Sequence, residues 1–489
     1  MKKTTRHFIP DIVNPSPDYF CTWQTQLYAT SDGKPQRQRD ALCEKALFDK
    51  EKPYGWAYFH EKARRDLYFV MDDSWDIPFG VHPERYGSLI LDKEKFPSFM
   101  RENNEKSLAA LNDALKALGW KAVGGWVCAQ VCEEVREGPD DEAYYIKRFK
   151  EADASGFGYY KVDWGNRAAD VSFRRRLSEL KRQYAPRLIL ENAVTREAVG
   201  FSDTFRTYDV PAVFSIPMTM AKNAEYLNAD AIEGAPALIC CEDEVYMAAS
   251  LGCTFGVMRH PYYGALPDGR ADMSFPAVHR DIKRRMNEVA RAARFHRIAP
   301  AFGVERASLS VSDRILTDDR RFERPEEEIE SWWFENDAVG KLPPDGIIRR
   351  SAPAAIARRM PLPDVTPDEN GEVPFVTASR HPNGTVAVAA HGRTHDRRFM
   401  TPLCDISVKA DGAENVGVFG AFGTLFLEGV KAKTVYAEDL IGGAAYDITD
   451  RVRVTENGIL LDGGLLTRVG TEENDPGDIS DAGVLLHLE

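Results

Sequence analysis

Short apolar runs alternate with longer, charge-rich segments over roughly the first 300 residues of the chain. The segments between the runs have helical spacing, as at Leu108, Leu111 and Leu115, where Gly119 then favours a helix end. Strands that alternate with helices predict a parallel sheet. The eight runs with strand character are residues 19–23, 66–71, 122–128, 158–162, 187–190, 204–208, 235–240 and 253–258.

Eight strand and helix alternations close most simply into a (β/α)8 barrel, here over residues 1–300 with a last helix over 276–297. An open, doubly wound sheet stays an alternative, because periodicity counts elements and does not show closure. Residues 301–372 are acidic, then aromatic, then turn-rich, which predicts a connecting region. Over residues 373–489, short alternating runs broken by Asn-Gly and Asp-Gly pairs predict an antiparallel β-sandwich domain.

Composition and charge narrow the class of protein. With 489 residues, 43% apolar and 28% charged, the chain is typical of a globular protein of more than one domain. A net charge of -13 argues against a nucleic-acid partner, which needs clustered Lys and Arg. The first residues lack the apolar run of a secretion signal, and no stretch reaches the length of a membrane span. We therefore expect a cytoplasmic protein without a membrane partner, and a homo-oligomer is left open.

The eight cysteines are too few and too irregular for a disulfide framework, so we expect free thiols. Cys128 with Cys132, and Cys240 beside Cys241, are weak candidates for a metal site, because no zinc-type spacing accompanies them. The sequence therefore predicts neither a metal nor an organic cofactor.

Acidic residues follow several of the predicted strands. In a barrel of this type the reactive groups lie at the carboxyl ends of the strands. Two carboxylates that flank a glycosidic bond cleave it: one protonates the leaving oxygen and the other attacks the anomeric carbon, while indole faces stack on the sugar. The residues expected at this mouth are Asp72, Asp73, Trp75, Trp126, Lys161, Asp163, Trp164, Glu191, Asn192, Arg206 and Asp209.

Two of these segments resemble a known group of enzymes. Residues 69–75, Phe-Val-Met-Asp-Asp-Ser-Trp, resemble the Asp-Asp-x-Trp signature of clan D glycoside hydrolases, families 27 and 36. Residues 159–165, Tyr-Tyr-Lys-Val-Asp-Trp-Gly, resemble their Lys-x-Asp nucleophile motif. Weaker similarities, to family 36 and raffinose-synthase-like proteins, lie at 95–97, 119–126, 191–192 and 206–209, and in the β-domain at 435–440 and 446–449.

The resemblance implies a retaining, α-galactosidase-like hydrolase. Asp163 would be its nucleophile and Asp209 its general acid and base, with the two carboxyls about 5 to 5.5 Å apart. Asp72 and Asp73 would accept hydrogen bonds from O4 and O6 of the sugar, and Lys161 would bind a neighbouring hydroxyl and keep Asp163 ionised. The remaining substrate-binding residues would be Trp75, Trp126, Trp164, Glu191, Asn192 and Arg206.

The chain also departs from the family pattern. Residues 191–197, Glu-Asn-Ala-Val-Thr-Arg-Glu, stand where family members usually place a Cys with small residues around O2, which leaves the C2 substituent of the sugar open. The layout is closer to the compact family 27, because the first strand begins near Tyr19 and leaves no room for the large amino-terminal β-domain of family 36.

Plainer interpretations exist for each motif. Asp72 and Asp73 could cap a helix or a loop, and Lys161 with Asp163 could be a structural ion pair. Asp209 suits a helix cap, with Asp203 as the rival acid. Two further groups are interpreted as structural: the acidic first turn of a helix at residues 242–244, and a loop histidine at 260.

Two other functions stay open at the level of sequence. One is a transglycosylase of the raffinose-synthase type, which passes the glycosyl group to a sugar acceptor. The other is a non-catalytic carbohydrate-binding protein on the same scaffold. In each case the partner is an oligosaccharide or glycoside.

Overall fold

The structure is a computed structural model, and it describes the chain except residues 31–34, 208–213, 259–260, 262–283 and 322–344. The predicted general acid Asp209, the histidine at 260 and the first part of the helix predicted over 276–297 lie outside the described residues.

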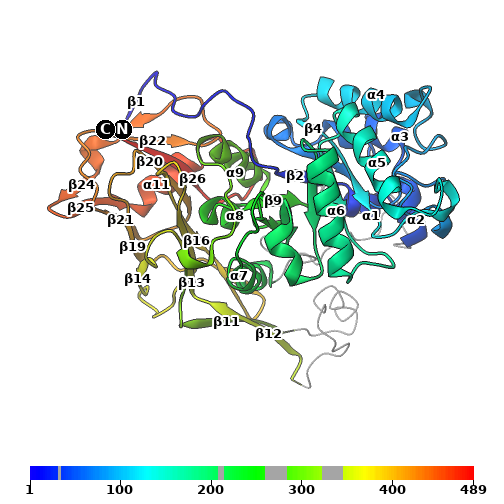
Figure 1. The fold of residues 1–489 in the computed structure, drawn as a ribbon. Helices are drawn as coiled ribbons and strands as arrows, with labels where there is room; N and C mark the ends of the chain where they lie inside the picture. Colours follow the sequence, from blue (N-terminus) through cyan, green and yellow to red (C-terminus); the bar gives the residue numbers. More distant parts are fainter. Residues whose placement is uncertain (31–34, 208–213, 259–260, 262–283, 322–344) are drawn as a thin grey trace.

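Eight parallel strands close into a barrel, so the (β/α)8 prediction is confirmed and the open sheet is wrong (Figure 1). Closure is direct: the first barrel strand pairs with both the second and the last. Each strand overlaps one predicted run, in the predicted order. The strands are β2 (Tyr19–Cys21), β3 (Tyr68–Met71), β4 (Ala122–Val127), β5 (Tyr159–Val162), β6 (Ile189–Asn192), β7 (Thr204–Arg206), β8 (Leu238–Glu242) and β9 (Thr254–Val257).

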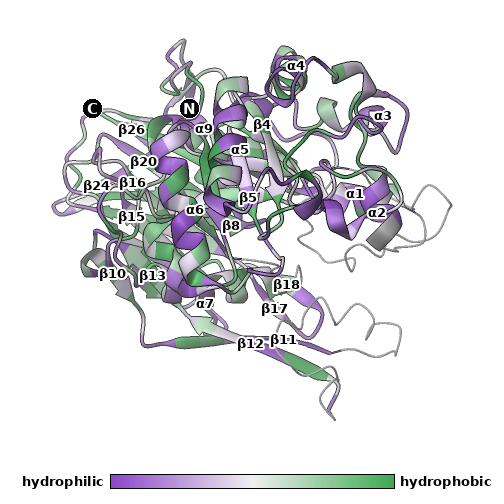
Figure 2. Ribbon diagram, turned by 45° about the vertical axis from the view of Figure 1, so that its right-hand side comes forward, coloured by the Kyte–Doolittle hydropathy of each residue, from purple (hydrophilic) through white to green (hydrophobic). Residues whose placement is uncertain are grey.

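Helices surround the barrel, and their apolar faces cover the strands. In α4 (Asn104–Ala117) the Asn103 side chain caps the first turn by accepting the Lys106 N–H at 2.9 Å, and Leu108 and Leu111 are buried. In Figure 2, α6 carries both hydrophilic and hydrophobic residues, as a helix between solvent and a sheet does. The other helices described in this half of the chain are α1 (Trp23–Ala29), α2 (Pro35–Ala41), α3 (Glu44–Phe48), α5 (Asp141–Ser155), α6 (Val171–Tyr184), α7 (Ser215–Tyr226), α8 (Val245–Leu251) and α9 (Met286–Ile298), and α11 (Gly463–Gly470) lies in the carboxyl-terminal half.

The carboxyl-terminal half forms β-sheets, which confirms the predicted β-structure there. The pairing is mainly antiparallel, with parallel pairs at β13–β15, β16–β20 and β19–β21. The larger sheet runs in the order β1 (Lys2–Lys3), β23 (Tyr446–Asp447), β22 (Val435–Asp439), β26 (Gly483–Leu488), β20 (Asn415–Gly420), β16 (Val386–His391), β15 (Phe375–Arg380), β13 (Ala355–Arg358) and β10 (Leu309–Val311). The second sheet has β14 (Asp364–Thr366), β19 (Asp405–Lys409), β21 (Thr424–Glu428), β25 (Gly458–Asp462) and β24 (Arg453–Thr455).

Elements from outside residues 373–489 belong to the larger sheet. Strand β1 at the amino terminus pairs with β23, and β10 and β13 come from the predicted connecting region. The two chain ends therefore lie side by side (Figure 1). The division of the chain at residues 300 and 372 stays a prediction.

Helices α8 and α9 lie between the barrel and the larger sheet (Figure 1). The guanidinium of Arg291 on α9 makes two bonds, of 2.8 and 2.7 Å, to the carboxylate of Asp439 on β22, and both side chains are buried. On β20, Gly417 lies so close to Phe295 of α9 that a Cβ would approach the ring to 2.4 Å. These contacts fix the β-sheet against the barrel.

All eight cysteines are free thiols, as predicted. Among the helices that the structure describes, none is long and apolar enough to cross a membrane.

Candidate active site

Alternation along the strands sorts the candidate residues between the lumen of the barrel and the helix layer. Side chains two positions apart on a strand face the same way. Lys161 on β5 and Asp163 just beyond it therefore share a side, and their contacts to residues of other barrel strands place both in the lumen. Glu191 of β6 and Arg206 of β7 join them there.

Asp163 lies at the carboxyl end of β5 and is held from two directions. One carboxylate oxygen, Oδ1, lies 2.5 Å from Nη2 of Arg206, and the other accepts the indole N–H of Trp126 at 3.0 Å. Burial acts to raise the pKa of Asp163, but the positive charges of Arg206 and Lys161 and the Trp126 hydrogen bond outweigh it, so the pKa lies below its usual value. The site therefore contains an ionised carboxylate.

Lys161 pairs directly with Asp72 rather than with Asp163. Its ammonium lies 2.7 Å from Oδ2 of Asp72, which also accepts the thiol hydrogen of Cys21 at 2.8 Å. The direct cationic partner of Asp163 is Arg206, and Lys161 acts on Asp163 through space. Lys161 thus lowers the pKa of Asp163 from a distance, while its predicted contact with a substrate hydroxyl stays a prediction.

Asp73 points to a different neighbour. Its Oδ2 lies 2.6 Å from Nε of Arg39, on α2 in the connection between β2 and β3. Burial raises the pKa of Asp73 to about 7 although Arg39 acts against the shift. The Arg39 guanidinium lies over the rings of Tyr86 and Trp164, at 5.6 and 5.8 Å from their centroids. Sequence reasoning missed Arg39 because no motif marks a residue in a long connection.

The three indoles of the predicted site differ in exposure. Trp164 is 36% exposed and contacts the rings of Trp126 and Tyr86, with centroids 5.2 Å away in both cases. Of the three indoles, it is the one that is exposed to a ligand. Trp126 is buried, and its N–H is used on Asp163.

Trp75 is not available to a ligand, which corrects the prediction for it. The ring is 0% exposed, donates its N–H to the carbonyl of Trp126 at 2.8 Å, and packs against Gly125 where a Cβ would approach to 2.7 Å. Trp75 therefore packs against β4, behind Trp126 and Gly125.

Asn192 also lies away from the mouth, because it follows Glu191 on β6 and so faces the helices. Its amide donates to Ser202 Oγ at 2.9 Å, and its oxygen accepts from Arg174 of α6 at 3.2 Å. Glu191 does face the lumen but is fully buried beneath Arg206, with Oε2 accepting the Tyr159 hydroxyl at 2.6 Å. Asn192 is therefore not placed to bind substrate as predicted, and the predicted substrate contact of Glu191 stays a prediction.

The acidic run at residues 242–244 is not the first turn of a helix. Glu242 is the last residue of β8, and its Oε1 lies 3.7 Å from Nη1 of Arg206 in the lumen. Asp243 accepts the Met258 N–H at 2.9 Å, and Glu244 precedes α8. Strand β8 therefore extends two residues, Cys241 and Glu242, beyond the predicted run.

The rival acid Asp203 lies at the wrong end of the barrel. It precedes β7, at the amino end of the strand, where Oδ2 pairs with Lys181 at 2.6 Å and accepts the Leu190 N–H at 2.8 Å. Asp203 is therefore a structural ion pair. Asp209, beyond the carboxyl end of β7, lies outside the described residues.

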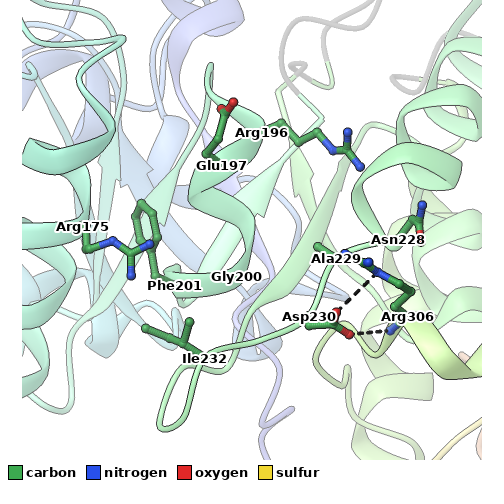
Figure 3. A pocket seen from close by; sticks show the side chains of 10 residues that line it. All are labelled: Arg175, Arg196, Glu197, Gly200, Phe201, Asn228, Ala229, Asp230, Ile232 and Arg306. Atoms are coloured by element: carbon green, nitrogen blue, oxygen red, sulfur yellow. Dashed lines mark hydrogen bonds and ion pairs between the residues drawn. The ribbon is translucent and has the colours of Figure 1, made fainter.

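Among the described residues, no group of three or more His, Cys, Asp or Glu side chains is arranged to hold a metal ion. A surface cavity of about 380 Å³ lies in the outer layer, where η6 (Arg196–Phe201) replaces a helix between β6 and β7 (Figure 3). Its lining includes the Asp230–Arg306 ion pair of 3.4 Å and none of the lumen-facing carboxylates. Its lining is Arg175, Arg196, Glu197, Gly200, Phe201, Asn228, Ala229, Asp230, Ile232 and Arg306.

Comparison with known proteins gives similarity of structure only. No protein-family model and no curated protein matches the chain. The chain is similar to an α-amylase from Geobacillus thermoleovorans solved with acarbose, with 9% identity, a TM-score of 0.42, and coverage of 98% of this chain and 100% of that one.

Two further solved structures carry provisional names. A Bacillus halodurans protein, provisionally an α-N-acetylgalactosaminidase, has 12% identity and a TM-score of 0.36 and covers 66% of this chain and 89% of its own. A Bacteroides fragilis protein, provisionally an α-galactosidase or melibiase, has 11% identity and a TM-score of 0.35, with 97% and 79% coverage. With TM-scores below 0.5, we base the function on the residues of this chain.

Proposed function

We propose that the chain is a retaining glycoside hydrolase that removes a terminal α-galactoside-like sugar from an oligosaccharide or glycoside, with Asp163 as nucleophile. The observation that carries the proposal is the Asp163 carboxylate at the carboxyl end of β5, held by Arg206 and Trp126 and kept ionised at neutral pH. An ionised carboxylate at this end of a barrel suits attack on an anomeric carbon.

The surrounding groups suit a neutral sugar. Asp72 and Lys161 form a compact acceptor and donor pair beside the nucleophile, which matches vicinal hydroxyls. The exposed Trp164 ring offers a face to the C–H side of a pyranose. The ion pair of Asp73 with Arg39 adds polar groups next to the Trp164 ring.

The proposed reaction is a double displacement. Asp163 attacks the anomeric carbon while Asp209 gives its proton to the leaving oxygen, which forms a glycosyl ester on Asp163. Asp209 then takes a proton from water, the water oxygen attacks the anomeric carbon, and the ester bond breaks. The released sugar keeps its anomeric configuration.

The test is turnover of p-nitrophenyl α-galactoside by the wild type and by Asp163→Gly, with Asp203→Asn as the control for a buried carboxylate outside the mouth. We expect activity in the wild type and in the control, and none in Asp163→Gly. Sodium azide should restore p-nitrophenol release in Asp163→Gly and give a galactosyl azide of inverted configuration.

Absence of turnover on any aryl α-glycoside would contradict the proposal and favour a carbohydrate-binding protein. Transfer to an added sugar acceptor in preference to water would favour the transglycosylase.

A further inference from the structure

Two buried carboxylates in the lumen of the barrel contact Arg206 from the two strands beside it. Glu191, on β6, places Oε1 at 3.7 Å from Nε of Arg206, and Glu242, on β8, places Oε1 at 3.7 Å from Nη1. Their exposed fractions are 0% and 2%. Strands β6 and β8 flank β7, so Arg206 extends between two acids of its neighbouring strands.

The contacts use different parts of the guanidinium. Glu191 lies beside Nε, Glu242 beside Nη1, and Asp163 beside Nη2, at 3.7, 3.7 and 2.5 Å. A guanidinium is planar and rigid, so fixing two of its nitrogens fixes the direction of the third. With Nε beside Glu191 and Nη1 beside Glu242, Nη2 is directed at the nucleophile.

The two acids are themselves fixed. The Tyr159 hydroxyl donates to Oε2 of Glu191 at 2.6 Å and lies 3.1 Å from Thr204 Oγ1 on β7. The Glu242 N–H donates to Thr207 Oγ1 at 3.1 Å, which fixes the end of β8 against the residue after β7. The two carboxylates that contact Arg206 are therefore carried by strands rather than by loops.

The charges in this layer show why a second cation does not substitute for Arg206. Lys161 is engaged with Asp72 at 2.7 Å. A buried arginine that loses its partners, or a buried carboxylate that loses its cation, leaves an uncompensated charge, which is strongly unfavourable. Arg206 thus lies against three carboxyl groups: the pKa of Asp163 is below its usual value, while burial raises the pKa of Glu191 although Arg206 acts against that shift.

We propose that Glu191 and Glu242 are positioning residues, which hold the Arg206 guanidinium against Asp163 and so fix the orientation and charge of the nucleophile. As far as the reaction is concerned, the inference rests on the proposed function. Among the residues that the structure describes, the other titratable groups that face this layer are Cys21 and Tyr19 of β2, Asp72 after β3, Lys161 and Tyr159 of β5, and Cys240 of β8.

The test compares Glu191→Gln and Glu242→Gln with Asp203→Asn, a buried carboxylate whose partner is Lys181 instead of Arg206. We expect kcat to fall about 10- to 100-fold in both Gln variants with KM little changed, because a nucleophile that is misplaced by a fraction of an ångström reacts slowly. The acidic limb of the kcat/KM profile should move to higher pH, because an Arg206 guanidinium that is no longer held against Asp163 lowers the pKa of that carboxyl less. Asp203→Asn should leave the limb in place.

Two further variants separate position from charge. Glu191→Asp and Glu242→Asp keep the charge and shorten the side chain, so the acidic limb should stay near its wild-type position while kcat still falls. If either Gln variant fails to fold, the Asp variant carries the test.

A readout without turnover separates this inference from the proposed function. In a double-mutant cycle of Glu242→Gln with Asp163→Asn, coupling through Arg206 predicts that the change in Tm of the double variant differs from the sum of the single changes by about 2 °C or more. Non-additive Tm changes in a protein without glycosidase activity would contradict the proposed function and leave the positioning role intact. Additive changes, with kcat and the pH profile as in the wild type, would overturn the positioning role.

Discussion

The guanidinium of Arg206 lies 2.5 Å from the carboxylate of Asp163, and the two residues come from alternate strands of the barrel, β7 and β5. Side chains of alternate strands meet in one layer of a (β/α)8 lumen, which is why residues distant in the sequence form this pair. The pair keeps Asp163 ionised against the effect of burial.

Replacing Arg206 should destabilise the fold as well as the site. In Arg206→Met, Asp163, Glu191 and Glu242 lose a buried cation, and we expect the free energy of unfolding to fall by about 3–5 kcal/mol. Arg206→Lys keeps the charge without the planar fork and should lose less. Urea denaturation measures both, and equal stability of Arg206→Met and wild type would contradict the contact.

The ionised state of Asp163 predicts a particular pH dependence. Because its pKa in the folded state is lower than in the unfolded chain, its contribution to stability is present above about pH 4 and is lost as pH falls through the folded pKa. The difference in free energy of unfolding between wild type and Asp163→Asn should therefore be constant from pH 5 to 7 and shrink below pH 4. A difference that grows on acidification would refute this assignment.

Asp73 should make the free energy of unfolding depend on pH in the opposite direction. Its pKa is raised to about 7, so its share of stability is complete below about pH 4 and is lost as pH rises from 4 to 7. Asp73→Asn should flatten the fall in unfolding free energy over this range. Asp76 is fully buried with its pKa raised to about 6, so Asp76→Asn should flatten the narrower range from pH 4 to 6. Unchanged slopes in both variants would show that neither carboxyl is protonated in the folded state.

Two tryptophans of the same site should respond differently to truncation. Trp164→Ala removes an exposed ring, so KM for a glycoside should rise while Tm changes little. Trp75→Ala removes a fully buried ring and should cost about 3–5 kcal/mol of stability. Thermal denaturation with steady-state kinetics distinguishes them, and the reverse pattern would contradict the exposures described above.

The Arg291–Asp439 pair should couple the barrel to the larger sheet. Asp439→Ala leaves a buried arginine unpaired between α9 and β22, and we expect a loss of about 3–5 kcal/mol. Calorimetry should show a lower Tm, with the transition broadened or split as the two parts unfold separately. Asp475→Ala is the control, because its pair with Lys62 is exposed and should contribute little. A Tm of Asp439→Ala equal to that of the control would show that the pair does not couple them.

The sequence by itself determined the order of the eight barrel strands and the acidic character of their carboxyl ends. Both follow from local patterns, because buried parallel strands are continuous apolar runs and the first polar residues after them mark the mouth. Asp72, Lys161 and Asp163 were found in this way, and the structure brings them together with Trp126.

Only the tertiary structure decided which of the candidates face the lumen and which partner each one takes. Glu191 and Asn192 are neighbours in the sequence, but one points into the barrel and the other into the helix layer, since the register of β6 sets the direction of each side chain. The partners of Arg206 and of Asp73 come from other strands and from α2. Such pairings depend on barrel closure and on long connections, which leave no periodic signal in the chain.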